Sequence, residues 1–137
     1  MKHFVLLLIM ISGLALTNCN QEDENDLYVI LTRPVWTTDS LLVNDLDASG
    51  PGQVLEKFKG DAKFNEDGTG TFGAYAGTWR FPDQTRTQLV IVTDSLALPL
   101  TTNIVELTKQ SLKITTELPD MTGMAENLRI RMTFKTK

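Results

Sequence analysis

The amino-acid sequence predicts an all-β domain, a small antiparallel up-and-down β-barrel of about eight strands. Three observations predict it. Apolar and polar residues alternate with period two in several segments, turn-forming residues separate these segments, and about eight such segments follow at short spacing. Period-two alternation indicates a sheet with one buried face and one face in water. Eight antiparallel strands with short connections close into a barrel, which leaves no strand edge exposed.

The alternation is clearest at residues 57–65, 112–118 and 128–135. Residues 36–44 and 87–93 are rich in β-branched residues, which favour strands. No helix is expected beyond a short helical turn at 23–31 or 121–127. We expect nine strand segments, or eight strands if two of them merge: 28–33, 35–44, 56–65, 69–73, 75–81, 87–93, 102–108, 111–118 and 127–136.

Turn signals agree with these boundaries. Asp67 and Gly68 lie between two β runs, which is a strong hairpin signal. Residues 82–85 and 108–111 have the composition of two more hairpin turns, and residues 46–53 that of a loop. The small residues of 72–79 predict a bulge or a sharp bend, because glycine inside a strand usually marks one.

The N-terminus has the pattern of a secretory signal peptide, assigned to residues 1–18. Lys2 precedes an apolar run at residues 4–16, and the acidic segment after Asn20 ends the apolar character. A membrane-spanning helix needs about 20 apolar residues, so this run is too short to be one. A short basic region followed by a short apolar run is typical of signal peptides.

The only cysteine follows this run at once. Leu16-Thr17-Asn18-Cys19 resembles the lipobox of bacterial lipoproteins, which implies a lipid on Cys19 and cleavage just before it. Two or more acyl chains anchor a protein stably to a membrane. The alternative is an ordinary secreted protein with an incidental cysteine.

Acidic residues follow Cys19 and resemble the export signal of Bacteroidetes surface lipoproteins, although such a run also suits a plain solvated spacer. We therefore interpret residues 19–32 as the lipidated cysteine with an acidic tether. The expected location is the outer membrane, with the domain facing the periplasm or the outside.

Composition excludes several classes of function. Removal of residues 1–18 takes away Lys2 and no acidic residue, so the net charge goes from −4 to −5. This balance gives no footprint for nucleic acid. His3, the only histidine, leaves with the signal peptide, and Cys19, the only cysteine, carries the lipid. The mature domain therefore has neither imidazole nor free thiol. This excludes Ser-His-Asp and Cys-His nucleophiles and zinc sites built from cysteine and histidine. No catalytic residue, metal site or cofactor is expected.

The order of motifs also resembles a family. Phe64–Thr69 ends a strand in a D-G-T turn, Gly77–Trp79 is a G-x-W strand, and Leu107–Leu112 is an L-T-x-x-x-L hairpin. Together they resemble the lipocalin-like small lipoproteins of Bacteroidetes, over residues 33–136. The resemblance implies a barrel domain at 33–137. It does not imply a particular ligand, since one fold serves many functions.

Five residues are candidates for ligand binding: Trp36, Phe64, Tyr75, Trp79 and Met132. A tryptophan in a strand either lines a pocket mouth or belongs to the core, and Tyr75 lies between glycines at either a contact site or a bend. Eight strands enclose one small ligand or are filled by their own side chains. We therefore expect non-enzymatic binding of a small apolar or amphipathic ligand.

Two alternatives remain open at this point. The first is a solid barrel that serves as an accessory subunit of an outer-membrane protein complex. The second, less favoured, is a hydrolase that uses paired carboxylates, although the spacing of acidic residues in the sequence indicates no particular pair. An internal apolar cavity of about 300 Å³ or more favours ligand binding, whereas a filled core with an exposed apolar patch favours protein interaction.

The lipid anchor is tested by Cys19→Ser. We expect this variant to appear in soluble or unprocessed form, because the acyl chains supply the free energy of anchoring. Membrane fractionation of the whole chain measures the distribution. A Cys19→Ser protein that is cut after residue 18 and still pellets entirely with membranes contradicts the lipoprotein interpretation.

Overall fold

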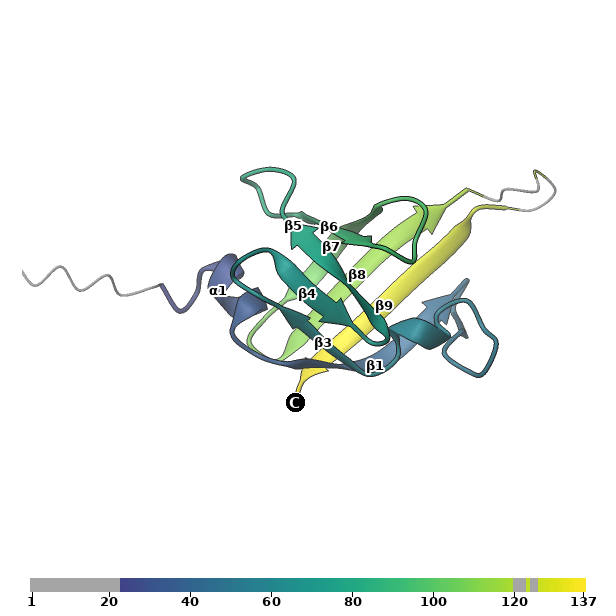
Figure 1. Ribbon diagram of the computed structural model, residues 1–137, viewed down its shortest axis with the longest axis horizontal. Coiled ribbons are helices and arrows are strands. Elements are labelled where there is room, and N and C mark those ends of the chain that lie inside the picture. Colours follow the sequence, from purple (N-terminus) through teal and green to yellow (C-terminus); the bar gives the residue numbers. More distant parts are fainter. Residues whose placement is uncertain (1–22, 120–122, 124–125) are drawn as a thin grey trace, which may run out of the picture.

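The computed structural model describes residues 23–119, 123 and 126–137; the signal peptide, Cys19 and Glu22 lie outside this range. These described residues form one short α-helix, one 3₁₀ turn and nine strands (Figure 1). They are α1 (Leu27–Thr32), β1 (Trp36–Val43), β2 (Leu46–Asp47), η1 (Glu56–Phe58), β3 (Asp61–Phe64), β4 (Thr69–Phe72), β5 (Tyr75–Arg80), β6 (Gln88–Thr93), β7 (Leu100–Leu107), β8 (Ser111–Leu118) and β9 (Leu128–Thr136).

The strands form a closed antiparallel barrel, as the sequence predicts. Each strand from β3 to β9 pairs with its neighbour in the chain, and β1 pairs with both β3 and β9. The β1–β9 ladder runs from Trp36 opposite Thr136 to Val43 opposite Ile130. The short β2 pairs only with the end of β1 and lies outside the ring. Eight strands therefore close the up-and-down barrel, and β2 is an addition to it.

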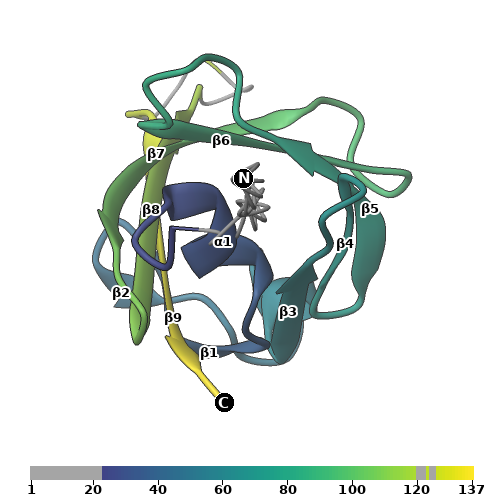
Figure 2. The same ribbon diagram turned by 90° about the vertical axis from the view of Figure 1, so that its left-hand side faces the viewer.

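The turns divide between two ends of the barrel. The end covered by α1, here called the helix end, holds the β3–β4 turn, the loop 81–87 and the turn 108–110. The opposite end holds the loop 48–60, the β4–β5 turn and the loop 94–99. Figure 2 shows α1 inside the ring of strands when the barrel is viewed along its axis from the helix end.

Two predicted strands are wrong in part. Residues 28–32 of the predicted strand 28–33 belong to α1, which agrees instead with the expected helical turn within 23–31. Residues 56–58 of the segment 56–65 form η1. Both sides of β1 are already paired, so 28–33 meets no free strand edge, and a helix satisfies its backbone hydrogen bonds locally. Asp26 caps α1 by accepting a 2.7 Å hydrogen bond from the Tyr28 N–H. The other segment considered for a helical turn, 121–127, lies largely outside the described residues.

The glycines of 72–79 act differently from the predicted bend. Gly73, with φ of 61°, and Ala74 form the two-residue turn between Phe72 and Tyr75, which pair directly. Gly77 lies within β5, where an added Cβ would come within 1.9 Å of the Val92 carbonyl oxygen. Only glycine therefore permits β6 to approach β5 so closely.

Large apolar side chains fill the interior. Trp36, Phe64, Leu112 and Met132 are each at most 1% exposed, and β8 and β9 point alternate residues inward as predicted. At the helix end, Leu31 of α1 is fully buried. At the opposite end, the buried side chains include Ala48, Leu55 and Phe58. The core thus extends through the barrel from one end to the other.

The strand register predicts different tolerance at adjacent positions of β9. Ile130→Asn places an amide among buried side chains, and we expect a loss of about 3–5 kcal/mol in the free energy of unfolding. Arg131→Asn removes only the exposed ion pair with Asp45, for which we expect a loss of about 0–1 kcal/mol. Thermal melts compare the two variants. Equal melting temperatures contradict the assigned register.

Candidate functional site

A wide groove lies at the helix end of the barrel. It has a volume of about 940 Å³ and opens to solvent. Four segments line it: the start of α1, the β3–β4 turn, the end of β5 and the loop that leads to β6. We call it the mouth groove. Its lining residues are Asp26, Leu27, Tyr28, Glu66, Gly68, Trp79, Arg80, Phe81, Asp83, Gln84, Thr85 and Arg86.

Aromatic rings form one wall of the mouth groove. The Trp79 ring centroid lies 5.7 Å from that of Tyr28 and 5.5 Å from that of Phe81. Phe64 packs edge-on against Trp79 from inside the barrel, at 5.6 Å. The indole N–H of Trp79 donates a 2.9 Å hydrogen bond to the Asn65 carbonyl oxygen. The tryptophan is therefore fixed at the boundary between the core and the groove.

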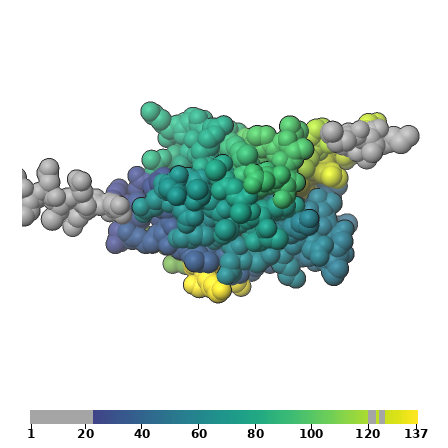
Figure 3. Space-filling view, viewed as in Figure 1, coloured from purple at the N-terminus to yellow at the C-terminus, as the bar shows by residue number. Residues whose placement is uncertain are grey.

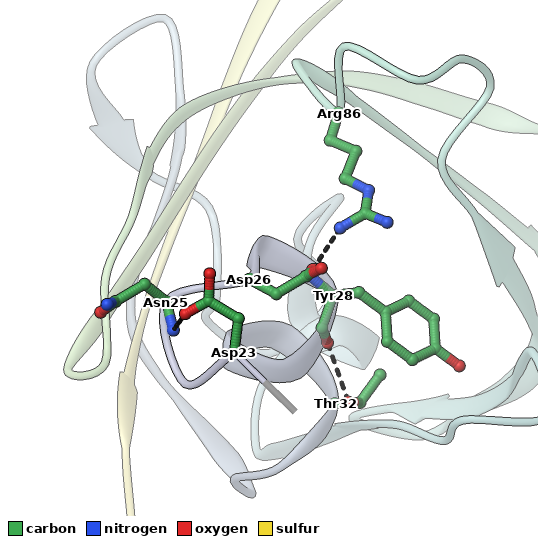
Figure 4. A network of polar contacts seen from close by, with 6 residues as sticks. All are labelled: Asp23, Asn25, Asp26, Tyr28, Thr32 and Arg86. Carbon is green, nitrogen blue, oxygen red and sulfur yellow. Dashed lines mark hydrogen bonds and ion pairs between the residues drawn. The ribbon is translucent and has the colours of Figure 1, made fainter. Parts of the chain in front are cut away.

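An ion pair crosses the mouth groove from α1 to the loop 81–87. The Arg86 guanidinium contacts the Asp26 carboxylate, as Figure 4 shows, and lies 5.6 Å from the Phe81 ring centroid. The backbone N–H of Tyr28, followed by Arg86, holds the pKa of Asp26 below its usual value. Tyr28 adds a second connection, because its hydroxyl donates to the Glu66 carbonyl oxygen. Both contacts hold α1 across the barrel mouth.

Two aspartates at the helix end, Asp83 of the groove lining and Asp67 of the β3–β4 turn, form hydrogen bonds within their own turns. The Asp83 carboxylate accepts hydrogen bonds from the backbone N–H and the hydroxyl of Thr85, and Asp67 does the same with Thr69. These bonds lower the pKa of both carboxyl groups. A lowered pKa suits a structural carboxylate, whereas a general acid at neutral pH needs a raised one.

The predicted ligand-binding residues lie in three different places. Trp79 lines the mouth groove and Phe64 packs behind it. Trp36 and Met132 lie in the core, where the Trp36 indole N–H donates a 3.0 Å hydrogen bond to the Leu31 carbonyl oxygen. Tyr75 lies at the opposite end, 4.8 Å from Phe58 between ring centroids. The structure therefore brings only Trp79 and Phe64 together at the groove.

Sequence reasoning missed the other groove residues. The sequence places Asp26 in an acidic tether, and its role as a helix N-cap follows only once residues 27–32 are interpreted as a helix. Arg80, Phe81 and Arg86 come from a hairpin whose approach to α1 depends on barrel closure. No local pattern in the sequence indicates that contact.

Comparisons with known proteins assign no function to the mouth groove. No protein-family model matches the chain, and no curated protein matches its sequence. Across residues 23–119, 123 and 126–137, no three His, Cys, Asp or Glu side chains converge as ligands for a metal ion. In the same part of the chain, no helix combines the length and apolar character needed to cross a membrane. The residues of the groove therefore carry the evidence for its function.

The Asp26–Arg86 contact predicts a change in titration. Arg86→Gln should raise the pKa of Asp26 toward its usual 3.8, but leave it lower than that because the Tyr28 N–H still donates. Ionised Asp26 stabilises the fold fully above its unfolded pKa, and this contribution is lost as the pH falls through the lowered folded pKa. Carboxyl NMR titration of both proteins measures the shift. An Asp26 pKa that is unchanged by the substitution contradicts the contact.

Proposed function

We propose that the protein is a cell-envelope lipoprotein, anchored to the outer membrane through Cys19, whose barrel binds a small amphipathic ligand in the mouth groove without catalysing a reaction. The lipobox resemblance of residues 16–19 supports the anchor. The observation that carries the binding site is the groove itself, an open hollow of about 940 Å³ with aromatic and charged walls. This volume lies in the range of small-molecule sites, about 300–1,000 Å³.

The filled interior favours the mouth groove over the barrel axis as the ligand site. Trp36, Phe64 and Met132, which the sequence suggested as a lining, are almost completely buried among other side chains. Native interiors are close-packed, and a ligand entering there would have to displace these side chains. At the mouth, Trp79 and Phe81 are already positioned beside open space.

The chemistry of the groove suits an amphipathic molecule with an anionic group. Its apolar part would lie against Phe81 and the edge of Trp79. Arg80 is exposed, lines the same groove and forms no ion pair with any described residue. Arginine binds carboxylate or phosphate oxygens through two parallel N–H donors. Arg86 is already paired with Asp26, so Arg80 is the cation available to the ligand.

A second function has a separate observation in its favour. Leu46, Val54 and Leu98 are 62–74% exposed at the opposite end of the barrel, where Leu46 belongs to β2 and the other two lie in loops. Exposed apolar residues around a filled core are typical of a protein-interaction module. In that case the barrel would be an accessory subunit of an outer-membrane complex, and its partner would contact the opposite end.

Titration with a dansyl-labelled fatty acid tests the ligand site. We expect the full chain to bind it with a dissociation constant near micromolar, about −8 kcal/mol. Phe81→Ala should weaken binding about tenfold, which is about 1.4 kcal/mol. Tyr75→Ala is the matched control, since Tyr75 is also a half-buried aromatic residue but lies at the opposite end. We expect this control to bind as the wild type does.

The result that contradicts this proposal is absence of uptake by the wild-type protein across a panel of anionic amphiphiles. Equal weakening by the two aromatic substitutions also counts against the mouth groove, because it points to a general effect on the barrel. Either result leaves the interaction module as the better supported function.

A further inference from the structure

The helix α1 has more apolar surface than the barrel buries. Its sequence, LYVILT, has an aliphatic or aromatic residue at every position before Thr32. Leu31 is fully buried and Tyr28 packs against the core. Leu27, Val29 and Ile30 are only half-buried, and none of these three is among the side chains that pack on the core. The outer side of α1 thus remains apolar and open.

This apolar surface continues into the residues after the helix. Val29, Ile30 and Pro34 line a shallow hollow of about 290 Å³, and Glu24, Arg33 and Lys109 form its rim. Val35 follows directly and is 40% exposed. We call the set Leu27, Val29, Ile30, Pro34 and Val35 the helix-end face; Leu27 lies at its border with the mouth groove, which it also lines. Figures 1 and 3 show that α1 lies at one extremity of the molecule, away from the loops of the opposite end.

Polar contacts hold the helix-end face in a fixed orientation. The Lys63 ammonium group donates to the carbonyl oxygens of Thr32, Arg33 and Pro34, at 2.5, 3.0 and 3.2 Å. These carbonyls at the C-terminal end of α1 have no partners within the helix, so a cation there stabilises it. At the other end of α1, Asp26 contacts Arg86. The barrel therefore presents the outer side of α1 rigidly.

The position of Cys19 determines what meets this face. Leu27 follows Cys19 by eight residues, a length of at most about 29 Å when extended. We propose that the helix-end face docks onto the surface of the bilayer that holds the lipid of Cys19. The inference rests on the proposed lipoprotein, and it adds the orientation of the barrel to that function.

The short tether makes a weak contact sufficient. Linking two binding groups through a short segment gives an effective concentration of about millimolar. A face with only millimolar intrinsic affinity for the bilayer surface is then docked about half of the time. Partly exposed valine, isoleucine and leucine side chains bind at this level by removing apolar surface from water. No deep insertion of α1 is needed.

The charges around the face indicate an apolar contact rather than an electrostatic one. Glu24 pairs with both Arg33 and Lys109, and Asp26 pairs with Arg86, so three basic groups are offset by two carboxylates and little net charge remains among them. The long side chains of arginine and lysine can reach toward lipid phosphates while their stems cover apolar surface. Docking should therefore occur on zwitterionic lipid and depend little on salt. It would also bring the mouth groove close to amphiphiles in the membrane.

Quenching by brominated lipid tests the proposed orientation. Full-length lipidated protein is reconstituted into phosphatidylcholine vesicles with or without bromine on the acyl chains near the headgroup. The variant Val29→Trp adds a tryptophan on the helix-end face. Leu98→Trp is the control, because Leu98 is 74% exposed and lies at the opposite end. Wild-type protein gives the background of Trp36 and Trp79. We expect the added tryptophan to lose fluorescence at position 29 and not at position 98.

The outcomes separate this inference from the proposed function. Equal quenching of both variants, or quenching of neither, in protein that remains with the vesicles overturns the docking and leaves the lipid anchor standing. Release of the wild-type protein from vesicles overturns the anchor and with it the docking. Val29→Asp gives a further check, since it should abolish the protection of α1 from hydrogen exchange that vesicles confer, while the melting temperature stays near that of the wild type. Protection that persists in this variant contradicts the role of the apolar face.

Discussion

The pairing of β1 with β9 is the interaction on which the rest of the structure depends. It joins the first and last strands along almost the whole of β1 and converts an open sheet into a ring. Closure removes the free edges that otherwise invite pairing with another chain. It also brings Trp36 of β1 and Met132 of β9 into the same interior, where neither is more than 1% exposed. Without this ladder, the two ends of the chain would lack a common core.

Closure also explains why the chain before β1 is helical. A strand at 28–33 would need a neighbour, and both sides of β1 are already used by β3 and β9. The segment instead turns across the barrel mouth as α1, where Leu31 completes the core and its carbonyl oxygen accepts the Trp36 indole N–H. The N-cap Asp26 and the helix residues Leu27 and Tyr28 line the groove, whereas Val29 and Ile30 remain on the outer side. Core, groove and outer face thus meet in six residues and their N-cap.

Because side chains fill the barrel interior, the surfaces available for binding lie at its two ends. The outer surface of the strands carries ion pairs, such as Asp39 with Lys135 and Asp61 with Lys137. Exposed ion pairs of this kind contribute little to stability. The helix end has the groove with aromatic and charged walls, whereas the opposite end has exposed leucine and valine in loops. Loops that are positioned by a rigid scaffold are the usual place for binding residues.

The sequence by itself determined the all-β class, most strand boundaries, the hairpin turns and the inward face of β8 and β9, because alternation and turn chemistry are local properties. For residues 28–33 the sequence did not distinguish a strand from a helical turn, because the periodicity of a short apolar run does not separate the two. Only the tertiary structure decided that Trp36 and Met132 are core residues and that Tyr75 lies far from Trp79. The contact between Asp26 and Arg86, which are sixty positions apart, is likewise visible only in the tertiary structure. Such contacts follow from the closure of the ring, and no short stretch of sequence contains that information.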